Sequence, residues 1–280
     1  MRRRPAHLLR HRNLAIGAIL TGGLVLAAAL SPFWTPYDAT AIDVANKLQG
    51  VSAAHWFGTD RFGRDILSMI MVGARNSIAV GVVAVGIGLA AGLPLGLWAA
   101  MRRGAVEEAL MRVTDLTFAF PAVLTAIMIT ALIGPGAINA ITAIGIFNIA
   151  VFSRVSRGAA LQVLGRPFIL SAAAIGRTPT DIAVRHVLPN MGAVLIVQAT
   201  IQFAVAILAE AGLSYLGLGV QPPAPSWGKM LNDAQTLIFL HPFQAVYPGL
   251  AIALSVLGLN LLGDGLRDVL DPRLRLWRAV

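Results

Sequence analysis

Long apolar stretches separated by short, basic segments dominate this chain. Six of them come close to the roughly 20 apolar residues that a helix needs to cross a bilayer. They cover residues 14–30, 77–100, 113–132, 137–152, 191–213 and 246–262. The pattern predicts an all-α membrane protein with six transmembrane helices, the fourth of which is the shortest.

The first apolar stretch has features of a secretory signal as well as of a membrane helix. Five arginines precede it, and it ends in Ala27, Ala28 and Ala29, as a signal with a cleavage site does. However, the apolar run is longer than the usual core of a signal, and Phe33 and Trp34 follow it as an interfacial anchor. We expect this helix to remain uncleaved.

Composition indicates that lipid is the main solvent of the chain. Charged residues make up 12% of it, against about a quarter in a typical soluble domain. Hydrophobic residues make up 57%, and the mean hydropathy is +0.75. The absence of cysteine from the sequence excludes disulfides, thiolate metal sites and a cysteine nucleophile.

The net charge of +9 allows two interpretations, nucleic-acid binding or membrane topology. If the N-terminus is cytoplasmic and six helices alternate, seventeen of the 22 Lys and Arg residues lie on the cytoplasmic side and five on the outer side. Cytoplasmic loops of membrane proteins carry such an excess. The distribution predicts that both termini are cytoplasmic, and it requires no nucleic acid as a partner.

Small residues and prolines mark two of the predicted spans. Gly88, Gly92 and Gly96 share one helix face, which lets a second helix approach closely. Pro94 in the same span and Pro121 in the next remove backbone donors and can kink their helices. Ordinary helix packing is the favoured interpretation, and a bent helix lining a translocation path is the alternative.

The cytoplasmic connection of residues 154–190 predicts two short helices, which we call the elbow (residues 167–190). The first covers residues 168–175 and stops at Gly176. Thr178 is the expected N-cap of the second, with Asp181 three residues later as in a capping box. Pro189 is expected to interrupt this helix, so that Asn190 caps the fifth span. The elbow is either a docking site for a soluble partner or a connector folded back on its own bundle.

The elbow resembles the signature loop of type I ABC importer permeases, which reads Glu-Ala-Ala, three residues, Gly, nine residues, Ile, one residue, Leu-Pro. Ser171-Ala172, Gly176 and Leu188-Pro189 stand at the matching positions. Residues 185–190 resemble the peptide-importer branch. Residues 57–65, 210–228 and 263–273 also resemble that branch, so the similarity covers nearly the whole chain. The group it resembles most is the second permease of dipeptide, oligopeptide and nickel importers.

This resemblance implies a type I ABC importer permease fold in a multi-pass subunit of a bacterial or archaeal cytoplasmic (inner) membrane. It implies four partner subunits besides the lipid bilayer: a second permease as heterodimer partner, two ATPase subunits and an extracytoplasmic binding protein. Di- or oligopeptides are the expected substrates, with nickel or another small solute left open. The chain divides into residues 1–76, a core permease domain of residues 77–266 with the coupling loop 154–190, and a tail of residues 267–280.

The resemblance also assigns the residues that couple the chain to its ATPases. They are Leu170, Ser171, Ala172, Gly176, Arg177, Thr180, Asp181, Arg185 and Pro189. Leu170 stands where the family has glutamate, and Ala173 where it often has arginine. Either the cognate ATPase compensates for these lost charges, or coupling rests on packing alone.

Other chemistry finds little support in the sequence. A phosphate-binding loop needs Gly-Lys-Ser or Gly-Lys-Thr, but Lys229 is followed by Met230. We therefore expect no ATP site and no cofactor in this chain, and no enzymatic activity of its own. The rival class, an ion-driven secondary transporter, predicts carboxylates deep in the membrane. Glu210 lies near a span end, where it either pairs with a partner subunit or reaches the outer interface.

Two outer segments complete the predictions. Residues 66–74 are amphipathic and are expected to lie on the outer membrane surface before the second span. Residues 214–247 form a proline-rich loop that carries Trp227. This loop meets either the binding protein or the partner permease.

Overall fold

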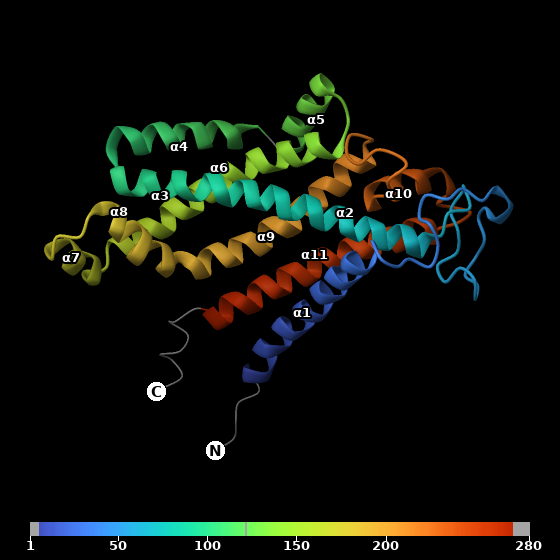
Figure 1. The fold of residues 1–280 in the computed structure, drawn as a ribbon, viewed down its shortest axis with the longest axis horizontal. Coiled ribbons are helices and arrows are strands. Elements are labelled where there is room, and N and C mark those ends of the chain that lie inside the picture. The colour runs from blue at the N-terminus through green and yellow to red at the C-terminus, as the bar shows by residue number, and fades with distance from the viewer. Residues whose placement is uncertain (1–5, 121, 271–280) are drawn as a thin grey trace, which may run out of the picture.

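The computed structural model describes residues 6–120 and 122–270, and helices make up most of this part of the chain (Figure 1). The α-helices are α1 (Ala6–Leu30), α2 (Ile66–Ile87), α3 (Leu93–Arg102), α4 (Gly104–Ala119), α5 (Ala122–Ile133), α6 (Ala137–Leu164), α7 (Pro167–Ala174), α8 (Pro179–Ile182), α9 (Leu188–Tyr215), α10 (Trp227–Ala234) and α11 (Phe243–Leu270). Two π-helical turns, Gly88–Gly92 and Ala183–Val187, join α2 to α3 and α8 to α9.

Within the described residues, five helices are long and apolar enough to cross a membrane, and a sixth span results if α4 and α5 count as one. The axes of these two helices differ by 82°. The predicted kink at Pro121 lies outside the described residues. The predicted number of spans agrees with the upper count, but several spans are longer than predicted. The fourth, expected over residues 137–152, continues to Leu164 as α6.

The second span starts at Ile66 rather than at Ser77, so the predicted surface segment of residues 66–74 is wrong. Asp65 begins α2 by accepting a hydrogen bond from the Ser68 amide (2.8 Å). Ile66 and Met69 are buried against α9, α10 and α11 instead of facing lipid. The apolar side of this stretch therefore packs on protein, and the expected domain boundary at residue 76 falls inside α2.

The predicted glycine face forms a close helix contact. A side chain at Gly88 would overlap Asn148 and Phe152, and one at Gly96 would overlap the Ser153 backbone, all on α6. Pro94 lies in the first turn of α3, directly after the π-helical turn, and the helix runs on to Arg102. The close packing expected of the glycine face is thus confirmed, and the lining of a translocation path by these spans stays a prediction.

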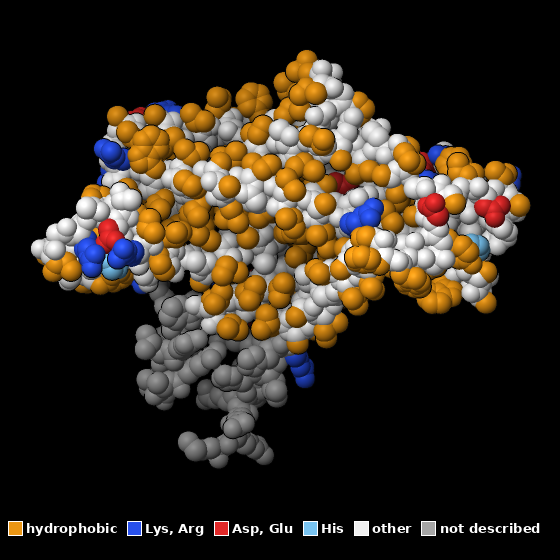
Figure 2. Space-filling model, viewed as in Figure 1, with side chains coloured by type: hydrophobic (Ala, Val, Ile, Leu, Met, Phe, Trp, Pro, Cys, Tyr) orange, Lys and Arg blue, Asp and Glu red, His pale blue; other side chains and the backbone are white. Residues whose placement is uncertain are grey.

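The helices run between two ends of the molecule. In Figure 1, α7 and α8 lie at one end, together with the turn between α3 and α4, while the segments that follow α1 and α9 lie at the other. Helices α1 and α11 pack side by side, with Gly17 against Leu262 and Gly258 against Leu20. Figure 2 shows hydrophobic side chains over the middle of the molecule and most of the charged ones towards its two ends. This is the distribution expected of a chain that crosses a bilayer.

Candidate functional site

The first half of the elbow folds as the local signals predict. Pro167 stands in the first turn of α7, where its missing N–H is not needed. Gly176 ends the helix with φ of +83°, a conformation that glycine adopts at little cost. The Arg177 amide then donates to the Ala172 carbonyl at 3.2 Å, which closes the turn.

The second half is held by a cap and by ion pairs. The Thr178 hydroxyl accepts from the Asp181 amide at 3.3 Å, which confirms the predicted N-cap. The Asp181 carboxylate lies 2.8 Å from Arg185 and 3.3 Å from Arg177. These pairs join the turn after α7 to the first turns of the next helix, so the elbow keeps one shape.

The predicted interruption at Pro189 is wrong. Helix continues from Pro179 to Tyr215: a π-helical turn precedes Leu188, whose amide donates to the Ala183 carbonyl, and Pro189 follows in the first turn of α9. Asn190 does not cap a new helix; its side-chain nitrogen donates to the His186 carbonyl at 2.7 Å. The second half of the elbow therefore belongs to the same continuous helix as α9, whereas α7 is joined to it by the turn at Gly176.

One face of the elbow packs inward and the other is free. Ile169, Ala172, Ile182 and Val187 belong to a core cluster shared with α6. Ala172 is only 6% exposed, so this predicted coupling residue supports the elbow from inside. The other predicted positions are exposed or, for Asp181, half-buried: Leu170, Ser171, Gly176, Arg177, Thr180, Arg185 and Pro189.

The free face has an apolar ridge with basic flanks. Leu170 is 69% exposed and Ile175 is 76% exposed. Arg177 and Arg185 stand beside them, and both share the single carboxylate of Asp181. Such a surface suits an apolar groove with an acidic rim on a soluble partner. The inward face is thus a connector folded back on its own bundle, and docking of a soluble partner on the other face stays a prediction.

Two buried polar contacts join the spans, and the sequence did not indicate either pair. Gln202 on α9 donates to the Asn148 side-chain oxygen on α6 at 2.8 Å. Glu210 is fully buried and accepts from Ser214 (2.7 Å) and from Ser77 on α2 (3.3 Å). The sequence suggested that Glu210 pairs with a partner subunit or reaches the outer interface. Both suggestions are wrong, because the side chain is buried and hydrogen-bonded within this chain. The four-residue spacing of Glu210 and Ser214, which places both on one helix face, was the sequence signal that could have predicted their contact.

Trp227 anchors the segment after α9 to this chain. Its ring nitrogen donates to the Ile70 carbonyl at 3.0 Å, and its side chain is buried in the core near Gly73. The Trp227 side chain is therefore held inside this chain, and the contact of the loop of residues 214–247 with the binding protein or the partner permease stays a prediction. Trp227 positions α10 against α2.

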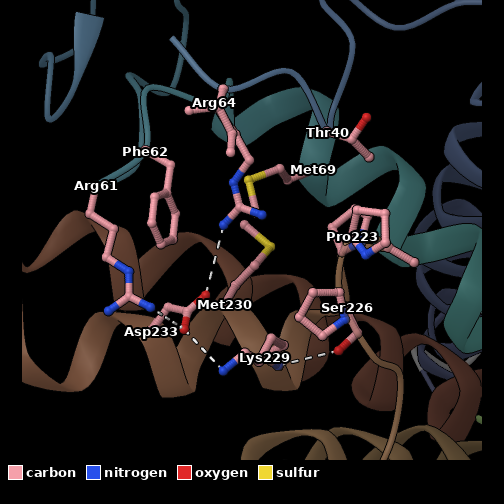
Figure 3. Close-up of a pocket in the computed structure, with 14 residues that line it drawn as sticks. Thr40, Arg61, Phe62, Arg64, Met69, Pro223, Ser226, Lys229, Met230 and Asp233 are labelled. Carbon is pink, nitrogen blue, oxygen red and sulfur yellow. Dashed lines mark hydrogen bonds and ion pairs between the residues drawn. The ribbon is translucent and has the colours of Figure 1, made fainter. Parts of the chain in front are cut away.

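A pocket of about 320 Å³ lies between α10 and the segment before α2 (Figure 3). Asp233 stands on one wall, 2.9 Å from Arg61, 3.1 Å from Lys229 and 3.8 Å from Arg64. Met69, Met230 and the prolines 222, 223 and 225 line the remainder. We call this the Asp233 pocket. Sequence reasoning missed it, because Arg61 and Asp233 are 172 positions apart.

Metal binding finds no support in the described part of the chain. No group of three or more His, Asp or Glu side chains lies close enough there to share an ion. His55, the best-placed histidine, binds the Asp65 carboxylate at 3.0 Å and so fastens the segment before α2. The two candidate sites are therefore the elbow and the Asp233 pocket, at opposite ends of the molecule.

The chain is similar to known transport proteins over nearly its whole length. It is 44% identical over 268 residues to the dipeptide transport system permease protein of Alkalihalophilus pseudofirmus, covering 95% of this chain and 88% of the relative. It is 45% identical, with the same coverage, to the glutathione transport system permease protein of Escherichia coli.

Solved structures agree on the fold. Two crystal forms of the inward-facing MetNI methionine ABC transporter superpose with TM-scores of 0.59 and 0.60, at 19% and 18% identity. Each match covers 75% of this chain and 95% of the solved chain. A profile of the family described as "binding-protein-dependent transport system inner membrane component" matches residues 92–276. The chain therefore belongs to this family and is a transmembrane permease subunit of an ABC importer.

Proposed function

We propose that this permease carries short peptides into the cytoplasm. The observation behind the proposal is the identity of 44–45% over 95% of the chain to permeases named for dipeptides and for glutathione. Both compounds are short peptides. Import of nickel or another small solute is the alternative that the sequence left open, and the uptake experiment below separates the two.

The proposed assembly contains four other subunits. A second permease would complete the path through the bilayer, two ATPases would bind the elbow end, and a binding protein would deliver the substrate outside. The orientation rests on charge, because Arg102, Arg103, Arg166, Arg177 and Arg185 all lie towards the elbow end. An excess of arginine is typical of the cytoplasmic side, so we assign that end and both termini to the cytoplasm.

We infer that the elbow transmits the movement of the ATPases to the spans. Leu170 and Ile175 would insert into the ATPase surface, while Arg177 and Arg185 contact acidic groups at its rim. Because helix is continuous from Pro179 to Tyr215, a push on the elbow displaces α9 along its length. At its far end α9 is bonded to α2 through Glu210 and Ser77, so both spans move together. This motion would switch the path between its inward-open and outward-open states.

ATP itself would be bound by the partner subunits. The sequence lacks the glycine-lysine loop that cradles phosphates. The work of this chain would then be mechanical: to accept force at the elbow and to change the packing of its spans.

Uptake into proteoliposomes tests the proposal. The complete importer would be purified from native membranes, reconstituted with ATP inside the vesicles, and supplied with its binding protein and labelled dialanine outside. ATP-dependent uptake that excess glutathione or other di- and tripeptides suppress, and that nickel does not, supports peptide import. Uptake of nickel without uptake of dialanine would mean that nickel, and not a peptide, is the substrate. Uptake by this chain alone, driven by an ion gradient without ATP, would overturn the importer assignment.

A further inference from the structure

The Asp233 pocket is built from segments that are rigidly fixed to each other. Asp60 shapes its loop by accepting from the amides of Phe62 and Arg64, both at 2.8 Å. On the other side, Lys229 and Asp233 stand one turn apart on α10, which Trp227 holds against α2. Figure 3 shows the basic side chains converging on Asp233 from both sides. The site is therefore formed before any partner arrives, which lowers the entropy lost on binding.

Positive charge exceeds negative charge in this pocket. Three basic side chains line it with one carboxylate, Asp233, and Arg64 is also paired with Asp60 outside the pocket at 2.6 Å. Arg61 and Lys229 then share Asp233, whose side chain is 15% exposed. The Arg61 side chain is 40% exposed, and a guanidinium has five donors, so most of them stay available. The open donors point to a second carboxylate as the missing acceptor.

The walls of the pocket argue for a protein partner and not for the transported solute. A solute in transit must pass between the spans, whereas this pocket is lined by the segment before α2, by α10 and by the turn that precedes it. Among the lining residues, the spans contribute Met69, in the first turn of α2. The volume of about 320 Å³ is at the small end for ligand sites and suits one or two side chains.

We propose that the Asp233 pocket is a docking site for an acidic side chain on the surface of the importer's extracytoplasmic binding protein. The carboxylate lies between Arg61 and Lys229, and its apolar stem contacts Met69, Met230 and Pro223. Methionine side chains adapt readily to such a stem. The inference rests on the proposed function, because it takes the pocket end of the molecule as the outer one.

Two substitutions that change the charge of the pocket in opposite directions test this docking site. Arg61→Gln removes a donor for the incoming carboxylate, and Asp233→Asn removes its competitor. The complete importer would be placed in nanodiscs, and the affinity of the purified binding protein measured by biolayer interferometry at low and high salt. We expect Arg61→Gln to weaken binding about three-fold or more and Asp233→Asn to strengthen it, with both effects shrinking as salt screens them. Lys47→Gln, an exposed cation of the same segment outside the pocket, should change nothing.

The opposite signs are what separate docking from a structural role. If the cluster only holds α10 to its neighbours, both substitutions weaken binding together with the thermal midpoint of the complex, and the inference is wrong. It is equally wrong if the wild type binds well and neither variant differs from it; the proposed function then stands. Binding of labelled dialanine to nanodiscs without the binding protein, lost in Arg61→Gln, would make the pocket a solute site. No binding by the wild type would overturn the inference and the binding-protein part of the proposed function together.

Discussion

Gln202 on α9 donates a hydrogen bond of 2.8 Å to Asn148 on α6, and both side chains are buried between the spans. The second polar atom of Asn148, its side-chain nitrogen, lacks a partner in the structure. α6 thus carries a buried polar group, one of whose hydrogen-bonding atoms is unsatisfied. The same Asn148 packs against Gly88, where α2 passes into α3. The bond therefore lies where three spans meet.

The first prediction concerns the strength of this bond. Asn148→Ala and Gln202→Ala should each destabilise the permease, and the double variant should be less destabilised than their sum. Interhelical hydrogen bonds in membranes contribute on average about 0.6 kcal/mol, so we expect a coupling energy of roughly 0.5–1.5 kcal/mol. Unfolding of the complex in detergent, followed for all four forms, measures it. Strict additivity would mean that the two side chains do not interact in the membrane.

The second prediction concerns the glycine face of α2 and α3. Gly96→Ala places a methyl group on the Ser153 backbone, which cannot move without shifting α6. We expect destabilisation of at least about 2 kcal/mol, in the range seen for overpacked cores. Gly86→Ala is the matched control on the same rod, because nothing lies within 4 Å of a methyl group there.

Alanine is the better helix former, so Gly86→Ala should leave stability unchanged or raise it by up to about 1 kcal/mol. Thermal unfolding of the two purified variants checks both expectations. Equal effects would show that the close approach of α3 to α6 relaxes easily, contrary to the packing described above.

Local signals in the sequence predicted the parts that are decided locally. The lengths of the apolar stretches predicted the spans. Gly176 predicted the end of α7 and Thr178 the start of α8, where the structure has them. The start of α2 was not predicted, because Ile66 and Met69 are buried by residues far away in the sequence, among them Trp227. A surface helix and a buried one have the same amphipathic pattern, and only the tertiary fold tells them apart.

The candidate sites show the same limit. Ala172 was grouped with the exposed elbow residues because the motif contains it, although its side chain supports the elbow from within. The sequence predicts a helix end at Pro189, since a π-helical turn before a proline has no clear local signature. The Asp233 pocket combines two segments that are far apart in the chain, so no local sequence pattern predicts it.

The third prediction concerns the turn that follows α9. The Ser214 hydroxyl donates to Glu210 and accepts from the Val220 amide at 3.1 Å, so it links the helix to the next segment. Ser214→Ala removes the partner of the Val220 amide and leaves Glu210 with the Ser77 bond alone in a buried site, which should reduce stability by roughly 1–3 kcal/mol. Hydrogen exchange should accelerate at Val220 before it does along α9.

The control for this change is Ser171→Ala, an exposed serine that bonds only within its own helix. Its effect on stability should stay within about 0.5 kcal/mol. If Ser214→Ala is as mild, water replaces the hydroxyl and the link from Glu210 to Val220 has no mechanical role.

The fourth prediction concerns the apolar ridge of the elbow. Leu170→Ala should weaken the binding of the ATPase subunits, because a leucine that becomes buried in a partner contributes about 1.5–3 kcal/mol, of which alanine retains only a part. Each 1.4 kcal/mol corresponds to a ten-fold change in Kd, so we expect a loss of roughly five-fold or more. Titration of the purified ATPases against the permease pair in nanodiscs measures this loss.

Leu240→Ala is the matched control for Leu170→Ala. Leu240 is 77% exposed against 69% for Leu170, but it lies in the segment between α10 and α11, at the opposite end of the molecule. The same truncation there should leave ATPase affinity unchanged. Ala172→Glu, by contrast, should destabilise the elbow itself, because its side chain faces Ile169 and the core of α6. If Leu170→Ala retains full affinity while Ala172→Glu loses it, the ATPases depend on the shape of the elbow and not on its ridge.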